Sequence, residues 1–69
     1  MPSSAIRDFE YDASCEQLLI TFVTGRTYVY DRVPEHVHDE FIAAPSKGAF
    51  FNRFIRDQYS YREVSRVAD

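Results

Sequence analysis

Residues 17–32, QLLITFVTGRTYVYDR, decide how this chain folds. Residues 17–23 are mostly leucine, β-branched or aromatic, without glycine or proline, and this composition is typical of a β-strand. Gly25 follows, and a glycine adopts the positive φ of a tight turn without steric cost. Residues 26–32, centred on Tyr28-Val29-Tyr30, then continue with strand-forming residues. The stretch therefore predicts an antiparallel β-hairpin.

The register of this hairpin depends on the number of residues in its loop. A two-residue loop at Thr24-Gly25 places Thr21 opposite Tyr28. It also places Leu19 opposite Tyr30. A three-residue loop reverses the relation between the two strands. In either register the first strand is apolar on both faces, so it is covered on both sides, or its sheet curls, or one face awaits a partner.

One further strand is expected before the hairpin. Residues 5–12 alternate along the chain with the period of a strand. The two faces are expected to carry Arg7, Phe9 and Tyr11 on one side and Ile6, Asp8 and Glu10 on the other. Residues 12–16 then predict a turn, because aspartate and serine side chains bond readily to nearby backbone groups.

Two short helices are expected after the hairpin. Pro34 and Glu35 begin the first, because proline fits the first helical position and a carboxylate suits the positive helix end. Pro45 ends this helix, since the residue before a proline is pushed out of helical geometry. Ser46 is then expected to cap a second helix over residues 47–58.

The order of strands first and helices second predicts an α+β fold. We expect one domain over residues 1–69, with its core at about 5–64 and short tails at both ends. The antiparallel sheet has three strands, or four if residues 59–64 close it, and the two short helices pack on it. The predicted interior consists of Leu18, Ile20, Phe22, Val29, Val37, Phe41, Phe50, Phe51, Phe54 and Ile55.

Composition and charge exclude several classes of protein. The chain has 69 residues, 45% of them hydrophobic, and no apolar run approaches the length of a membrane span. The single cysteine, Cys15, excludes a disulfide framework and a cysteine-rich zinc module. The first residues do not resemble a signal peptide, so we expect a cytoplasmic protein. The net charge of −3 argues against an overtly basic nucleic-acid binder.

No catalytic site, metal site or cofactor is expected. His36 and Glu40 are neighbours on the predicted helix, but His38 lies on a different side of it. Two ligands on one helical turn form at most a weak metal site. Cys15 lies in a predicted turn without a base to activate it. A chain this short also has little volume for a substrate pocket, so we do not expect an enzyme.

An ordered set of motifs runs through most of the chain. The motifs are Tyr28-Val29-Tyr30, Val33-Pro34, Ala44-Pro45-Ser46-Lys47-Gly48, Phe50-Phe51-Asn52 and Ile55. In this order they resemble the KTSC domain family, and the resemblance covers roughly residues 3–64. That family is named for the C-terminal extension of some lysyl-tRNA synthetases and also occurs as stand-alone bacterial proteins. The resemblance implies no established activity and no catalytic residues, and the association with the synthetase suggests RNA binding.

Basic residues gather toward the end of the chain. Residues 1–46 hold three basic and eight acidic side chains, whereas residues 47–69 hold five basic and three acidic ones. Most of the basic residues are arginines, which bind phosphates through paired hydrogen bonds and stack on bases. The alternative interpretation is that these are ordinary solvated charges.

An RNA-binding surface is expected around the Tyr28–Tyr30 pair. Two rings on one sheet face could stack two unpaired bases, with Arg26 and Arg32 on the same face to hold phosphates. The alternative is a tyrosine pair that packs beneath a helix. Lys47 lies at a helix start, where an anion could bind. The expected RNA contacts are Tyr28, Tyr30, Arg26, Arg32, Lys47, Asn52, Arg53 and Arg56.

The sequence therefore predicts a non-catalytic binding module that contacts RNA, with tRNA as the first candidate. The alternative is a protein-binding or self-associating module, which rests on the two-sided apolar strand and the acidic first part of the chain. Neither prediction involves a metal, a cofactor or a membrane.

Overall fold

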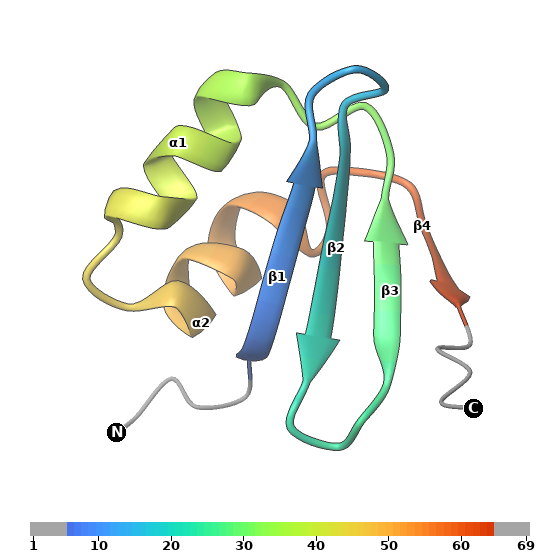
Figure 1. Ribbon diagram of the computed structural model, residues 1–69. Coiled ribbons are helices and arrows are strands. Elements are labelled where there is room, and N and C mark those ends of the chain that lie inside the picture. Colours follow the sequence, from blue (N-terminus) through green and yellow to red (C-terminus); the bar gives the residue numbers. More distant parts are fainter. Residues whose placement is uncertain (1–5, 65–69) are drawn as a thin grey trace.

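In the computed structural model, which describes residues 6–64, a four-stranded antiparallel sheet carries two short helices on one face (Figure 1). The strands, in spatial order, are β1 (Ile6–Asp12), β2 (Gln17–Phe22), β3 (Thr27–Tyr30) and β4 (Tyr61–Val64). Between β3 and β4 the chain forms the helices α1 (Glu35–Ala43) and α2 (Lys47–Phe50) and a π-helical turn, η1 (Phe51–Ile55), that continues α2. The predicted α+β fold is thus confirmed, and residues 61–64 form the closing strand that the sequence left open. The predicted tails lie outside the described residues.

The β2–β3 hairpin has a three-residue loop, residues 23–25. The backbone N–H of Phe22 donates to the carbonyl of Arg26 at 2.9 Å, and the N–H of Gly25 donates to the carbonyl of Phe22 at 2.8 Å. Gly25 has a φ of 95°, a conformation that residues with a Cβ rarely adopt. A left-handed residue at this position fits the chain to the twist of the two strands. The hydrogen bonds show that the loop has three residues, so the register predicted from a two-residue loop is wrong.

The longer loop decides which side chains face the helices. Leu18 pairs with Tyr30, and Ile20 pairs with Tyr28. These four side chains share one face, because directly opposed residues in an antiparallel pair point to the same side. Val29 lies on the opposite face, although the first register would have placed it beside Leu18 and Ile20. The tyrosine pair therefore lies on the helix-covered side of the sheet.

A β-bulge at Arg7 interrupts β1. The register of β1 against β2 shifts between Ile6 and Asp8, so Arg7 is an extra residue in the strand. Because the bulge restarts the alternation, Ile6 shares a face with Phe9, and both pack against the core. The predicted separation of these two residues onto opposite faces is therefore wrong.

The helix starts lie close to their predicted positions. Pro34 was predicted to be the first helical residue of α1. It is the N-cap residue instead, with extended backbone (φ −65°, ψ 154°), and the helix begins at Glu35. Ser46 caps α2 as predicted, since its Oγ accepts a hydrogen bond from the N–H of Ala49 at 3.2 Å. The second helix then widens, because the N–H of Arg56 donates to the carbonyl of Phe51, five residues back, at 2.8 Å.

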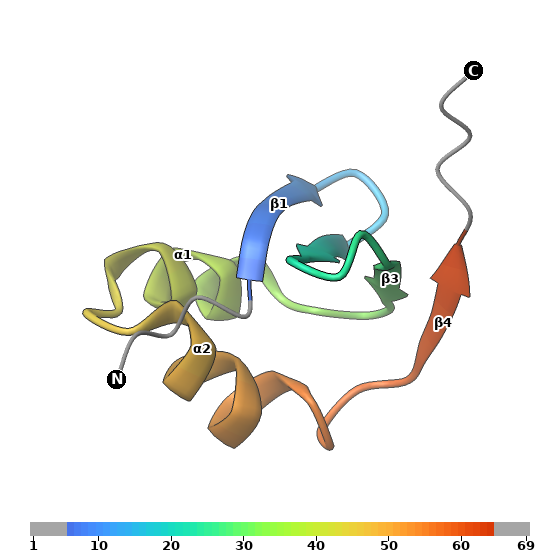
Figure 2. The ribbon, with the colours of Figure 1, turned by 90° about the horizontal axis from the view of Figure 1, so that it is seen from below.

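The core lies between the sheet and the helical segments, and Figure 2 shows the sheet curving around it from β1 to β4. Its buried residues are Leu18, Ile20, Tyr30, Val33, Val37, Phe41, Phe51 and Ile55. Burial of this apolar surface is the main term that stabilises the fold. Tyr30 and Val33 were missing from the predicted interior, whereas Val29 is buried on the other face of the sheet.

Phe54 was predicted to belong to the core but is 50% exposed. The π-helical turn explains this difference, because it rotates successive residues through a smaller angle than an α-helix does. Phe51 and Ile55 remain directed inward, and Phe54 turns to solvent. Phe22 and Phe50 are only partly buried, at the margin of the core.

Candidate functional site

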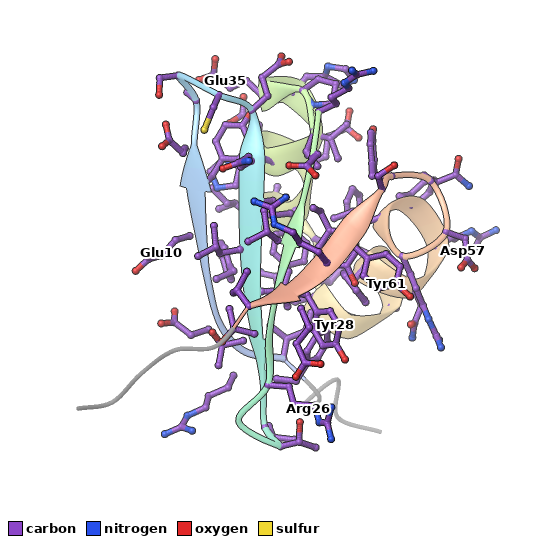
Figure 3. All side chains as sticks on the ribbon, turned by 90° about the vertical axis from the view of Figure 1, so that its right-hand side faces the viewer. Glu10, Arg26, Tyr28, Glu35, Asp57 and Tyr61 are labelled. Carbon is purple, nitrogen blue, oxygen red and sulfur yellow. The ribbon has the colours of Figure 1, made fainter. Side chains whose placement is uncertain are left out.

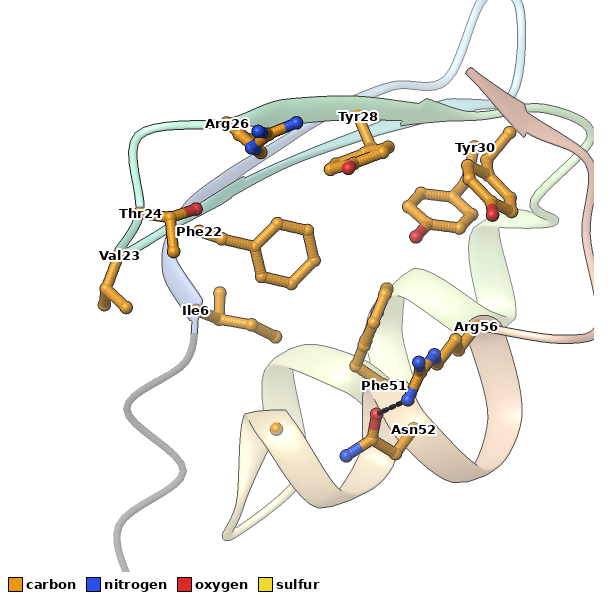
Figure 4. A pocket seen from close by; sticks show the side chains of 12 residues that line it. Ile6, Phe22, Val23, Thr24, Arg26, Tyr28, Tyr30, Phe51, Asn52 and Arg56 are labelled. Carbon is orange, nitrogen blue, oxygen red and sulfur yellow. Dashed lines mark hydrogen bonds between the residues drawn. The ribbon is translucent and has the colours of Figure 1, made fainter. Parts of the chain in front are cut away.

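A cleft of about 410 Å³ opens between the β2–β3 hairpin with β4 on one side and the α2–η1 segment on the other (Figure 4). Aromatic side chains make up much of its lining. Arg26 lies at the hairpin end of the cleft, and Asn52 and Arg56 line it from η1. We call this feature the aromatic cleft.

Five rings of the aromatic cleft contact one another in a closed cycle. In order, they are Phe22, Tyr28, Tyr61, Tyr30 and Phe51, with neighbouring ring centroids 5.2–5.7 Å apart. Tyr61 stacks on Tyr30 at an interplanar angle of 29°, and the other four contacts are edge-to-face. Edge-to-face contacts set the positive edge of one ring against the negative face of the next. The cycle therefore holds a set of ordered rings around the cleft before any ligand binds.

The five rings differ in what they offer to a ligand. Tyr61 is 56% exposed, and Phe22 and Tyr28 are partly buried. Tyr30 is only 3% exposed, and its ring packs against Phe51. Tyr30 therefore follows the alternative interpretation of a tyrosine packed beneath a helix, and the stacking of bases on this pair stays a prediction. Tyr28 remains accessible from the cleft.

The phenol of Tyr30 keeps a polar function despite the burial of its ring. Burial raises the pKa of Tyr30 to about 12, and the neighbouring phenols of Tyr61 and Tyr28 add to the shift. No fully buried polar side-chain atom in residues 6–64 lacks a hydrogen-bond partner, and none of these residues bonds the Tyr30 hydroxyl. The hydroxyl therefore reaches the cleft, as Figure 4 shows, and it stays protonated at neutral pH as a donor.

Two guanidinium groups border the aromatic cleft, and they are engaged differently. The Nη1 of Arg26 lies 3.3 Å from a carboxylate oxygen of Glu63. The Nη1 of Arg56 donates to the Oδ1 of Asn52 at 3.4 Å, a bond to a neutral amide. Figure 3 shows Arg26 with Tyr28 and Tyr61 on one side of the molecule, with acidic Glu10 on the opposite side. The charged side chains that line the cleft are therefore both cationic, on a chain whose net charge is negative.

The fold brings five of the eight predicted contact residues to the aromatic cleft. They are Arg26, Tyr28, Tyr30, Asn52 and Arg56. They come from β3 and the loop before it and from η1, segments that are separated by a helix in the sequence. The structure thus gathers them into one place, and whether they contact RNA stays a prediction.

Three predicted contact residues lie elsewhere. Arg32 has a φ of 60°, which breaks the strand alternation that placed it with the tyrosines, and it lines a separate polar hollow. The Nζ of Lys47 donates to the carbonyl of Ala44 at 3.0 Å. Arg53 projects from η1 over the ring of Phe54, 5.9 Å from its centroid, in a shallow apolar hollow. The expectation that Arg32 shares a face with the tyrosines is therefore wrong, and whether Lys47 and Arg53 contact RNA stays a prediction.

Tyr61 is the main cleft residue that the sequence analysis missed. It lies directly opposite Tyr30 in the β3–β4 pair. The alternation of residues 59–64 contained this signal, since it put Tyr61 and Glu63 on one face. Only the pairing of β4 with β3 shows that this face adjoins the tyrosine pair.

The described residues offer little for other chemistry. Residues 6–64 contain no cluster of three histidine, cysteine, aspartate or glutamate side chains that could hold a metal ion. Partial desolvation, followed by a hydrogen bond with Asp12, raises the pKa of the exposed Cys15 thiol, which disfavours the reactive thiolate. Within the same range, the helices are too short to cross a bilayer.

Comparison with known proteins identifies close relatives over nearly the whole chain. The sequence model of the KTSC domain matches residues 2–59. A crystal structure of a KTSC domain protein from Yersinia pestis superposes with a TM-score of 0.88 at 37% identity, covering 94% of this chain and 92% of that one. The fold described above is therefore also the fold of an experimentally determined relative.

Sequence relatives fall into two size classes. A lysine–tRNA ligase of Nostoc punctiforme is 37% identical over 62 residues, and one of Trichormus variabilis is 36% identical over 62 residues. Each match covers 90% of this chain but 11% of the ligase, so the chain spans about a tenth of these relatives. A protein of Tsukamurella paurometabola is 39% identical over 57 residues, covering 83% of this chain and 85% of that protein. The same unit thus occurs within a large enzyme and as a small protein.

Proposed function

The chain belongs to the KTSC domain family, and we propose that it is a non-catalytic binding module that contacts RNA through the aromatic cleft. The observation that carries this proposal is the combination of accessible rings with two guanidinium groups around one cleft. Aromatic rings stack on bases, and guanidinium groups bind the phosphates beside them. Lysine–tRNA ligases among the relatives make tRNA the first RNA to test.

Local charge, rather than net charge, supports this proposal. The chain carries a net charge of −3, which alone disfavours a polyanion. The charged side chains that line the aromatic cleft, however, are the guanidinium groups of Arg26 and Arg56. The carboxylate of Glu63 pairs with Arg26, and that of Asp57 acts electrostatically on Tyr30. With two phosphates contacted on single-stranded RNA, the affinity should fall about 7-fold between 50 and 200 mM salt.

The test is a titration of the chain with fluorescently labelled tRNA at low salt, followed by anisotropy and by amide NMR shifts. Arg56→Ala should weaken binding several-fold, because it removes a cleft guanidinium that a phosphate would contact. Arg53→Ala is the matched control: it removes the same charge from the same helical turn, but outside the cleft. Equal losses in the two variants, or the absence of shifts around the cleft at high micromolar tRNA, would contradict the proposal.

A second candidate function, protein binding or self-association, is favoured by the apolar surface on the other side of η1. Phe54 and Ile42 are about half exposed, and Phe54 lines a shallow hollow with Pro45 and Phe50. Exposed apolar patches of this kind mark contact surfaces. Sedimentation at several concentrations tests it: a dimer that Phe54→Ala dissociates supports this function, and a monomer at every concentration argues against self-association.

A further inference from the structure

Resting on the proposed function, we propose that the aromatic cleft accepts one unpaired base, and that Tyr61 is the ring on which this base stacks. The ligand class is therefore an RNA with a nucleotide that has left its helical stack, such as a bulge or a loop. Fully paired RNA is excluded from the cleft in this proposal. Tyr61 was not among the residues predicted from the sequence, and its role follows from the strand pairing.

The dimensions of the cleft favour one base. Its volume of about 410 Å³ lies near the lower end of the range typical of small-molecule sites, roughly 300–1,000 Å³. Tyr30 cannot receive a base, because its ring is 3% exposed, stacks with Tyr61 and makes an edge-to-face contact with Phe51. Tyr30 therefore offers no second stacking surface beside Tyr61, and the duplex, which is far wider than one base, cannot enter.

Tyr61 is the ring with the largest accessible surface in the cycle, at 56% exposed. It is also already ordered, because its ring centroid lies 5.2 Å from that of Tyr30 in a stacked contact and 5.7 Å from that of Tyr28 in an edge-to-face contact. An ordered ring loses little conformational entropy when a base stacks on it, so more of the stacking free energy contributes to affinity. These contacts distinguish Tyr61 from Phe54, an aromatic residue with similar exposure outside the cleft.

Asn52 and Arg56 supply polar groups at the η1 wall of the cleft. The Oδ1 of Asn52 accepts from Arg56 at 3.4 Å, which leaves the two amide N–H groups of Asn52 to donate to the edge of a base. In a duplex, pairing occupies the Watson–Crick edge of each base, whereas an unpaired base presents that edge. The remaining N–H groups of Arg56 can bind the phosphate next to the stacked base.

The two guanidinium groups also argue against the other ligand that aromatic rings recognise, a quaternary ammonium ion. Such cations bind over aromatic faces in cages of several rings. At this site Arg26 and Arg56, the charged residues of the cleft lining, would repel a cation, and the carboxylate of Glu63 already pairs with Arg26. Choline therefore serves as a competitor that separates the two ligand classes in the experiment.

The experiment compares two RNA hairpins of equal length and charge, one with a single unpaired 2-aminopurine and one fully paired. The chain should bind the first at least 10-fold more tightly, and stacking on Tyr61 should quench the 2-aminopurine fluorescence. Tyr61→Ala should reduce affinity for that hairpin about 5- to 150-fold, the range expected from loss of one base–ring stack. Tyr61→Phe retains the ring and should stay within 2-fold of the wild type. Phe54→Ala, the matched aromatic control, should leave binding unchanged.

Each other outcome overturns the inference in a recognisable way. Equal affinity for both hairpins, with loss of binding in Arg56→Ala, would retain RNA binding but refute the unpaired base. Unchanged binding by Tyr61→Ala, checked for folding by circular dichroism, would refute the role of Tyr61. Displacement of the RNA by millimolar choline would assign the cleft to a cation. Failure to bind any RNA at low salt would refute the proposed function itself.

Discussion

The same face of the sheet uses aromatic side chains in opposite ways at its two ends. Beneath α1, Phe9 packs against Phe41 at 4.7 Å and Tyr11 stacks on His38 at 4.4 Å. The Tyr11 hydroxyl there donates to the carbonyl of Val33 at 2.6 Å. Beside η1, five rings border a cleft instead, and the hydroxyl of a tyrosine faces it. The number of aromatic residues therefore does not decide whether a region becomes a core or a cleft. The path of the backbone that covers the sheet decides it.

The two regions differ because the covering segments differ. The helix α1 has nine residues, and its buried Val37 and Phe41 close directly onto the sheet. The segment α2–η1 has four α-helical and five π-helical residues, which direct Phe51 inward and Phe54 outward. We name these regions the closed end and the cleft end. Four variants test the distinction, in order of decreasing expected effect on the free energy of unfolding.

The largest effect is expected from Phe41→Ala at the closed end. Phe41 is fully buried and contacts Phe9 and Phe50, so its removal leaves a cavity and should lower the free energy of unfolding by about 3–5 kcal/mol. A loss of this size is enough to unfold many small domains. Urea denaturation followed by circular dichroism measures it, with Phe54→Ala as the exposed control. A similar loss in both variants would contradict the packing described.

The next effect is the pH dependence of the free energy of unfolding, and it arises from Tyr30 in the wall of the cleft. Because the pKa of Tyr30 is raised to about 12 from the ordinary 10, the folded state binds this proton more tightly than the unfolded chain does. The resulting stability is complete below pH 10 and is lost as the pH rises through 10 toward 12, by about 2–3 kcal/mol in total. Melting temperatures at pH 8–12 should fall less steeply in Tyr30→Phe. If the melting temperature of Tyr30→Phe falls with pH as steeply as that of the wild type, a group other than Tyr30 causes the loss of stability at alkaline pH.

A smaller effect separates the two tyrosine hydroxyls at neutral pH. Tyr11→Phe removes the donor to the carbonyl of Val33 and should cost about 1 kcal/mol, the typical contribution of such a bond. Tyr30→Phe should cost less, because the Tyr30 hydroxyl bonds to none of the described residues. Chemical denaturation of the two variants in parallel measures the difference. The comparison fails if Tyr30→Phe is the more damaging of the two.

The smallest effect on stability is expected at the rim of the cleft. Glu63→Gln breaks an exposed ion pair with Arg26, so the free energy of unfolding should change by less than about 1 kcal/mol. The same substitution should strengthen binding. Arg26 becomes available to a phosphate, so the affinity for RNA should rise about 2-fold or more. Anisotropy at 50 mM salt measures this change. A weaker affinity would show that Glu63 contributes to binding directly.

The elements of the fold could be predicted because each rests on local chemistry. The uninterrupted strand at residues 17–22, the cap at Ser46 and the helix stop at Pro45 all act within a few residues. The hairpin register could not be predicted with the same means. The choice between two and three loop residues depends on how Gly25, at a φ of 95°, matches the twist of two strands.

The candidate site was predicted in part for the same reason. Tyr28, Asn52 and Arg56 reach one cleft, although the sequence offered them only as residues of suitable chemistry. The two arginines that lie outside the cleft illustrate the limit: Arg32 leaves its strand through a positive φ, and Arg53 turns away from the cleft on the π-helical turn. Both departures depend on backbone conformations that strand alternation and an ideal helical period do not describe.

The sequence by itself determined the class of fold, the order of the elements up to the second helix, and the supply of aromatic rings and arginines, because composition, spacing and capping act over a few residues. The tertiary structure alone decided that β4 sets Tyr61 beside Tyr30, that Tyr30 is buried, and that a cleft remains open on one side. These features depend on contacts between segments about thirty residues apart, Tyr30 and Tyr61 among them. A single residue added to a loop or a helical turn exchanges the faces of an element, and no local preference of the chain records that exchange.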